Sequence, residues 1–157
     1  MARATVEKRP NQKAPSLNSI GFLLHRAQAR LHDAVVEAIQ GSGLVPGQLA
    51  VLGALSDRGG MSQRRLGEVA HIEKSSMVLF LDALEKDGWV RRERDPSDRR
   101  AHIVQLTPCG VDRFVALGPR LLTAQQLFLK PLNSTAVSAL TDLLTQLGVP
   151  LDGKGEV

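Results

Sequence analysis

The stretch WVRRERDPSDRRAHIVQLT, residues 89–107, decides the fold of this chain. Two short runs within it, residues 89–94 and 100–106, alternate between apolar and polar residues as half-buried strands do. Between the runs lies Asp95-Pro96-Ser97-Asp98, whose residues are typical of a tight turn. The sequence therefore predicts a β-hairpin. Arginines at positions 91, 92, 94, 99 and 100 make this hairpin basic, and guanidinium groups on a narrow ribbon favour contact with DNA phosphates and the minor groove.

The residues just upstream predict two helices joined by a tight turn. The first begins at the N-cap residue Ser62 and ends at Ala70. The second runs from Lys74 to Asp87, and Gly88 terminates it. Small or apolar residues occupy the places that fix the crossing of such a pair: Leu66, Gly67, Ala70, Ile72, Met77 and Phe80. His71 stands in the turn, where it tolerates positive φ better than most residues. A helix-turn-helix followed by a basic hairpin indicates a winged DNA-binding unit.

Long amphipathic helices are expected on both sides of this unit. One covers residues 16–39, and a shorter one begins at Pro46 and stops at Gly59. After the hairpin, Thr107-Pro108 begins a helix that continues toward Lys130, and Asn133 caps a last helix. Their apolar stripes exceed what a single winged lobe can bury, which favours pairing with a second copy. We expect the dimer contacts to include Leu17, Ile20, Leu140, Leu143 and Leu147.

The fold class is therefore mainly α with a small β-hairpin wing, a winged helix-turn-helix lobe plus long dimerisation helices. Residues 1–15 form a flexible basic arm, either a solvated tail or a contact to flanking phosphates or to the partner subunit. Residues 16–45 and 108–150 form the helical dimerisation region, and residues 46–107 form the DNA-binding lobe. Residues 151–157 are a frayed tail.

Composition narrows the possible function. The chain has 157 residues, a net charge of +4, 3% aromatic residues and no tyrosine, so a platform that stacks RNA bases is disfavoured. Its single cysteine excludes an internal disulfide and fits a reducing cytoplasm. No apolar run approaches a membrane span, and the polar N-terminus lacks a signal sequence, so we expect a cytoplasmic protein without a membrane partner. No phosphate loop, metal-spaced cluster or paired nucleophile and base is visible, so neither an enzyme nor a cofactor is expected.

Candidate DNA contacts lie at the starts of the two lobe helices and on the hairpin. Hydroxyls, amides and one ammonium at the start of the recognition helix face phosphates or base edges, and the outward apolar residues can contact thymine methyl groups. Leu79 has an alternative place in the core. The candidates are Ser62, Gln63, Arg64, Lys74, Ser75, Ser76, Val78, Leu79, Arg94, Asp98, Arg99 and Arg100.

Two segments carry the closest resemblance to a known family: Leu84-Glu85-Lys86-Asp87-Gly88-Trp89-Val90 and the wing Arg94-Asp95-Pro96-Ser97-Asp98-Arg99-Arg100 with its following Leu-Thr-x-x-Gly. Over roughly residues 17–148 the chain resembles the MarR family of transcriptional regulators. The resemblance implies a homodimer, a palindromic operator on double-stranded DNA, and relief of repression by a small ligand. It also implies that Arg100 enters the minor groove, oriented by Asp98 and supported by Arg94 and Arg99, unless the Asp98–Arg100 pair only shapes the hairpin. The chain departs from the family at Val78 and Leu79, where Thr and Arg are frequent.

The sequence says least about the small-molecule effector of such a regulator. Similar proteins hold aromatic carboxylates, phenolics or aryl-CoA thioesters between the dimer helices and the winged lobe. Arg26 and Arg30 lie one turn apart on the first helix and can clamp a negative group, with His25 nearby. Alternatively, Arg30 pairs with Asp33 or stays solvated. His25 and His32 lack the neighbours of a metal site, so no metal is expected.

The sequence leaves two alternative functions open. A winged helix that binds proteins instead of DNA is conceivable, because charge over residues 62–107 is nearly balanced. A redox-responsive regulator is the other, because Cys109 lies in the first turn of a helix, near the positive end of the helix dipole. Redox sensors of this family carry their cysteine near the first helix, so a small buried thiol is the favoured interpretation of Cys109.

Overall fold

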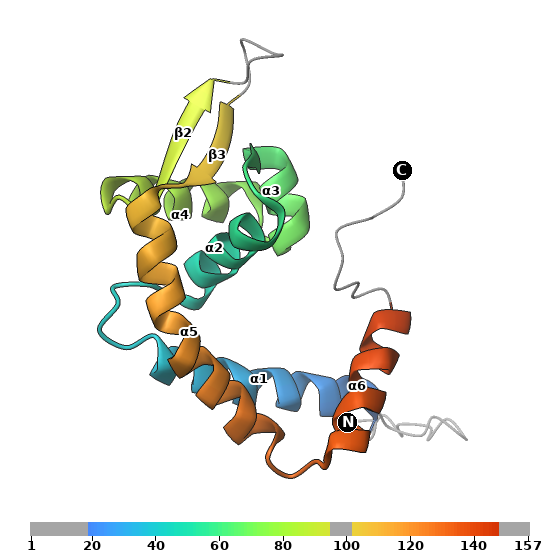
Figure 1. Cartoon of the computed structure of the whole chain (residues 1–157). Helices are drawn as coiled ribbons and strands as arrows, with labels where there is room; N and C mark the ends of the chain where they lie inside the picture. The colour runs from blue at the N-terminus through green and yellow to red at the C-terminus, as the bar shows by residue number, and fades with distance from the viewer. Residues whose placement is uncertain (1–18, 95–101, 148–157) are drawn as a thin grey trace, which may run out of the picture.

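A computed structural model describes residues 19–94 and 102–147 of the chain. Its helices and strands are, in order, α1 (Ile20–Ala38), α2 (Pro46–Arg58), β1 (Met61–Ser62), α3 (Gln63–Ala70), α4 (Lys74–Lys86), β2 (Val90–Arg94), β3 (His102–Leu106), α5 (Pro108–Leu129) and α6 (Ser134–Gln146). A lobe made of α2, α3, α4 and the strands sits at one end of the molecule, and α5 runs from this lobe to α1 and α6 at the other end (Figure 1). The fold is mainly helical with a small antiparallel sheet, as the sequence predicts.

Side-chain caps begin three of the helices at the predicted residues. The Ser62 hydroxyl accepts a hydrogen bond from the Arg65 backbone N–H, 3.3 Å away, at the start of α3. Thr107 and Asn133 do the same for α5 and α6, with distances of 2.8 Å and 2.9 Å. Each cap satisfies a backbone donor that the first helical turn leaves without a partner. These local signals explain why the helix boundaries could be predicted closely.

The sheet contains one strand more than the predicted hairpin. Its order is β1-β3-β2, all antiparallel, with Val90 opposite Leu106 and Arg94 opposite His102. The added strand β1 pairs Met61 with Val104 and Ser62 with Ile103, so it ties the start of α3 to the hairpin. Because two residues are too few to show an alternating pattern, this strand could not be predicted from the sequence.

One apolar core fixes the lobe. It is built from α2, α3, α4, the residue just before β2, β2, β3 and a single residue of α5, namely Val51, Leu52, Leu55, Leu66, Met77, Leu81, Leu84, Trp89, Val90, Val104 and Leu117. The tight turn between α3 and α4 has His71 in the left-handed region, with φ 51° and ψ 43°, as anticipated. Gly67 faces the same turn, and a Cβ there would lie 3.1 Å from the Ile72 carbonyl oxygen. A small residue is therefore favoured at this close crossing.

Candidate nucleic-acid interface

The outer face of α4 carries the candidate base-reading residues. Val78 and Leu79 are 38% and 69% exposed, while Met77 and Leu81 on the other side of the helix are buried in the core. Leu79 therefore points outward as predicted, and its alternative place in the core is wrong. Lys74 and Ser75 are exposed in the first turn, where the backbone N–H groups and the positive end of the helix dipole favour anions such as phosphates.

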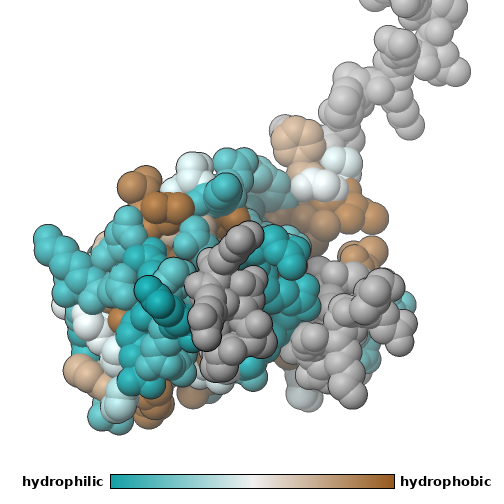
Figure 2. Space-filling view, turned by 90° about the horizontal axis from the view of Figure 1, so that it is seen from above, coloured by the Kyte–Doolittle hydropathy of each residue, from teal (hydrophilic) through white to brown (hydrophobic). Residues whose placement is uncertain are grey.

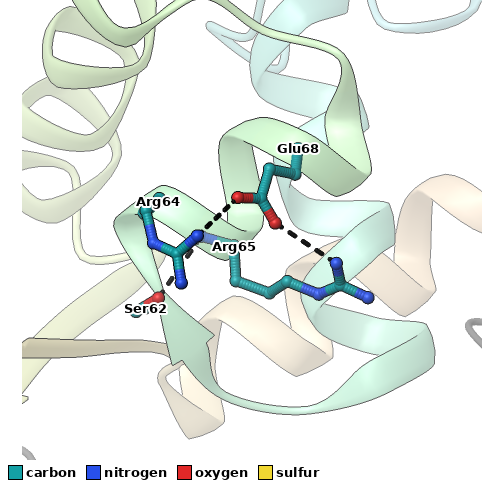
Figure 3. Close-up of polar contacts among 4 residues, drawn as sticks. All are labelled: Ser62, Arg64, Arg65 and Glu68. Atoms are coloured by element: carbon teal, nitrogen blue, oxygen red, sulfur yellow. Dashed lines mark hydrogen bonds and ion pairs between the residues drawn. The ribbon is translucent and has the colours of Figure 1, made fainter. Parts of the chain in front are cut away.

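Two arginines at the start of α3 share one carboxylate. Arg64 Nη1 lies 2.8 Å from Glu68 Oε1, and Arg65 Nη1 lies 3.2 Å from Glu68 Oε2 (Figure 3). Ser62 sits beside them as the helix cap, and Gln63 is half-buried. Exposed pairs of this kind contribute little to stability, so phosphates can replace Glu68 as the partner of either guanidinium group. Arg65 was absent from the sequence-based candidates, although its place next to Arg64 on a lobe helix was visible in the sequence.

Arg92 joins the wing to the recognition helix. Its backbone N–H donates to Glu85 Oε1 at 3.1 Å, its Nη1 to Glu85 Oε2 at 2.7 Å, and its Nη2 to Asp82 Oδ1 at 2.7 Å. Partial burial alone lowers the pKa of the Arg92 guanidinium, but the hydrogen bonds to Asp82 and Glu85 outweigh it, so the pKa lies above its usual value. The contact also neutralises two carboxylates that would otherwise repel phosphates. The sequence predicts Arg92 only as one of the basic residues of the hairpin and does not predict its contacts with Asp82 and Glu85.

The wing strands carry further charges toward the tip. Arg91 Nε lies 2.9 Å from Glu93 Oε1, and Arg94 is exposed at the end of β2. The tip itself, with Asp98, Arg99 and Arg100, lies outside the described residues. The roles expected for these three residues therefore stay predictions.

A second junction fixes the end of α4 to the start of α5. The Arg113 guanidinium lies 3.7 Å from the centre of the Trp89 ring, and its Nη1 donates to the Asp87 carbonyl at 2.9 Å. The Thr107 hydroxyl donates to the Gly88 carbonyl at 2.7 Å. A Cβ on Gly110 would lie 2.0 Å from the Trp89 carbonyl oxygen, so the two segments touch through their backbones. The recognition helix and α5 are thus joined by several short contacts.

The far end of the molecule exposes apolar side chains on α1 and α6. Ile20, Leu143 and Leu147 are 75%, 56% and 70% exposed, whereas Leu140 is half-buried. Seen from the wing end, apolar surface gathers beside the point where the chain enters α1, while much of the lobe surface is hydrophilic (Figure 2). Leu17, the remaining candidate dimer contact, lies outside the described residues.

A cavity of about 380 Å³ lies where α1 meets the junction of α5 and α6. Arg26 and Arg30 both line it. Much of the remaining lining is apolar and includes Leu23, Ala27, Phe128, Leu129 and Leu140. His25 is not among the lining residues, so the structure brings together two of the three candidate ligand contacts. No lobe residue lines this cavity, so it lies among the dimerisation helices and not between them and the winged lobe as expected. No ion pair joins Arg30 to Asp33 within residues 19–94, so that part of the alternative for Arg30 is not supported. Arg30 is exposed, so the solvated alternative stands beside its place in the cavity lining.

Cys109 is exposed, so the expectation of a small buried thiol is wrong. It occupies the second position of α5, and the chain turns toward the core only at the buried Gly110. The described residues contain no group of three or more His, Cys, Asp or Glu side chains that could hold a metal ion. In the same residues, no helix is both long and apolar enough to span a membrane.

Comparisons with known proteins agree on one family. The family model described as "MarR family" matches residues 44–102, which hold the helix-turn-helix and most of the wing. A regulatory protein proposed for the hcr operon of Thauera aromatica is 28% identical over 129 residues, which are 82% of this chain and 78% of that protein. These relatives are transcription regulators and not enzymes, in agreement with the prediction from the sequence.

Solved structures of two regulators resemble the whole architecture. Bordetella bronchiseptica BpsR, whose DNA binding is regulated by 6-hydroxynicotinic acid, is 28% identical and superposes with a TM-score of 0.76, covering 82% of this chain and 98% of that one. The repressor CouR, solved on a 23-mer DNA duplex, is 28% identical with a TM-score of 0.76, covering 87% of this chain and 99% of that one.

Proposed function

This chain belongs to the MarR family of transcriptional regulators, and from that membership we propose that it is a homodimeric repressor released from a palindromic operator by a small aromatic acid or its CoA thioester. The observation that carries the proposal is the arrangement of α3, α4 and the wing, which together form the candidate DNA-binding surface. The Arg64–Glu68–Arg65 cluster of α3 lies next to the first turn of α4, where Arg64, Glu68 and Lys74 line one pocket. Arg92 attaches the basic wing to α4. The cations on these neighbouring elements suit contacts to the phosphate backbone of DNA, and the exposed face of α4 suits the major groove.

Dimer formation is supported by the apolar surface at the far end of the molecule. Ile20 on α1 and Leu143 and Leu147 on α6 are exposed in the single chain, and exposed large apolar side chains at one end of a molecule are typical of an interaction site. A second copy is the natural occupant, because a twofold axis matches a palindromic operator. The two recognition helices then sit about one turn of DNA apart, roughly 34–36 Å.

At the wing, we propose that Arg100 enters the minor groove and that Asp98 orients it. Arg94 and Arg99 bind the flanking phosphates. These roles follow from the resemblance to the family and from the place of Arg94 at the exposed end of β2. A narrow minor groove attracts guanidinium groups through its negative potential.

The effector proposal rests on the cavity between α1 and the α5–α6 junction. Its volume of about 380 Å³ and its largely apolar lining suit a small aromatic body, and Arg26 and Arg30 suit a carboxylate or phosphate. An effector can release DNA only if it favours a lobe spacing different from that of the DNA-bound state. A preference on the order of 100-fold, about 2.7 kcal/mol, gives a useful response.

The effector is tested by titrating benzoate, hydroxybenzoates and benzoyl-CoA against the protein–operator complex, with toluene as the neutral compound. We expect at least one acid or thioester to release the DNA. In Arg26→Ala and Arg30→Ala, the required concentration should rise about tenfold or more, because each guanidinium–carboxylate hydrogen bond contributes roughly 1.5–3 kcal/mol. Operator affinity without effector should not change.

Arg58→Ala is the matched control, since Arg58 is an exposed arginine at the end of α2 and does not line the cavity. It should keep the effector response of the parent protein. Release by the neutral compound but by none of the anions would contradict the anionic effector. An unchanged response in both cavity variants would remove Arg26 and Arg30 from the site.

A further inference from the structure

The outward face of the recognition helix is unusually apolar for a surface that reads bases. Ser75, Val78, Leu79 and Asp82 follow one another at the spacing that places residues on one side of a helix, and all four are exposed. The Asp82 carboxylate is held by Arg92 at 2.7 Å. This face therefore offers none of the arginine, asparagine or glutamine side chains that bind a base edge through two hydrogen bonds.

Packing within the chain does not explain the two apolar side chains. α4 packs against α2, α3 and β2, and it uses Met77, Leu81 and Leu84 for this purpose. Val78 and Leu79 lie on the other side, 38% and 69% exposed. They are flanked by Lys74 and Ser75, whose ammonium and hydroxyl groups suit phosphates, so the same face that carries the apolar residues also carries polar groups for DNA. Val78 and Leu79 therefore belong to the proposed DNA interface and can make apolar contacts with DNA there.

In the major groove, the C5 methyl group of thymine is the apolar group that base pairs present. We infer that Val78 and Leu79 recognise thymine methyl groups in each half-site, so that methyl contacts take the place of the paired hydrogen bonds that arginine, asparagine or glutamine would make from this face. This inference rests on the proposed function, and it names the chemistry by which that interface distinguishes sequences. Removing one buried methyl group corresponds to about a fourfold change in an equilibrium constant.

The test begins with wild-type protein and a pool of random DNA duplexes, from which bound sequences are selected. In the selected operator, each thymine is then replaced by deoxyuridine, which lacks only the methyl group, at symmetric places in both half-sites. Affinity is measured by fluorescence anisotropy. At one or two positions per half-site we expect a loss of about fourfold for each methyl group, or about fifteenfold for a symmetric pair. At such a position, 5-methylcytosine should bind more tightly than cytosine by the same factor.

Variants then assign the effect to residues. Val78→Ala and Leu79→Ala should each weaken binding to the thymine operator and lose the penalty for deoxyuridine at one position, with circular dichroism unchanged because both side chains are exposed. Val45→Ala removes another exposed apolar side chain of the chain, ahead of α2, and should keep the full penalty.

The possible failures are distinguishable. If the protein selects an operator but binds every deoxyuridine duplex like the thymine duplex, or if both α4 variants keep the full penalty, this inference is wrong while the proposed function stands. If no duplex is selected at any salt concentration, the proposed DNA binding is wrong and this inference falls with it.

Discussion

Replacing Leu143 and Leu147 together with arginine is expected to give a folded monomer without measurable operator affinity. Both side chains are more than half exposed on α6 in the single chain, so the substitutions leave its own packing intact. In the proposed dimer they would place charges in an apolar interface, which costs several kcal/mol for each ion removed from water. Sedimentation equilibrium measures the assembly, and anisotropy with the selected operator measures the affinity.

Thr145→Arg is the control for this experiment, because Thr145 is exposed on the opposite side of α6. It should remain dimeric and bind DNA. Leu140 is left unchanged, since it is half-buried and lines the cavity beside Arg26, so its replacement would disturb the single chain as well. A wild-type protein that is a stable monomer at micromolar concentration would contradict the proposed assembly, as would a dimeric double variant.

The second large effect is expected at Gly110. Alanine there would put its Cβ 2.0 Å from the Trp89 carbonyl oxygen, and neither backbone can yield without moving the junction between α4 and α5. We expect Gly110→Ala to lower the free energy of unfolding by about 3 kcal/mol, at the upper end for overpacked substitutions. Urea unfolding at one fixed protomer concentration measures this change, because the stability of a dimer depends on concentration.

Gly53→Ala is the matched comparison, since Gly53 lies within α2 and a Cβ there would meet nothing within 4 Å. Alanine in a helix interior is more favourable than glycine by up to about 1 kcal/mol, so this variant should be more stable than the parent protein. The same substitution should thus act in opposite directions at the two sites. Equal stability of Gly110→Ala and the parent would show that the close contact at Trp89 does not exist.

Features that depend on a few neighbouring residues could be predicted from the sequence. Ser62, Thr107 and Asn133 cap their helices because a hydroxyl or amide oxygen reaches the N–H three residues ahead, which needs no distant partner. The left-handed His71 and the outward Leu79 follow from the spacing of the helix-turn-helix residues in the same way. The family resemblance rests on these local patterns too.

Features that depend on contacts between residues far apart in the chain could not be predicted from the sequence. Strand β1 exists only because β3, some forty residues later, pairs with it. Arg92 acquires its role because three hydrogen bonds tie it to Asp82 and Glu85 on another element. Cys109 is exposed and not buried as the sequence predicts, because burial at the start of α5 begins one residue later, at Gly110. The cavity beside Arg26 and Arg30 is lined on its other side by residues of α5 and α6, about a hundred residues further along the chain, so it could not be predicted from the sequence.

Titration of a labelled operator duplex with the wild-type chain over a series of salt concentrations tests the central claim most directly. A dimeric DNA-binding regulator should saturate at two protomers per duplex, and the logarithm of its affinity should fall linearly with the logarithm of the salt concentration as phosphates exchange counterions for arginine and lysine. Affinity for a scrambled duplex should be lower by about a thousandfold or more at physiological salt. Equal affinity for operator and scrambled DNA, or no binding even at low salt, would contradict the account.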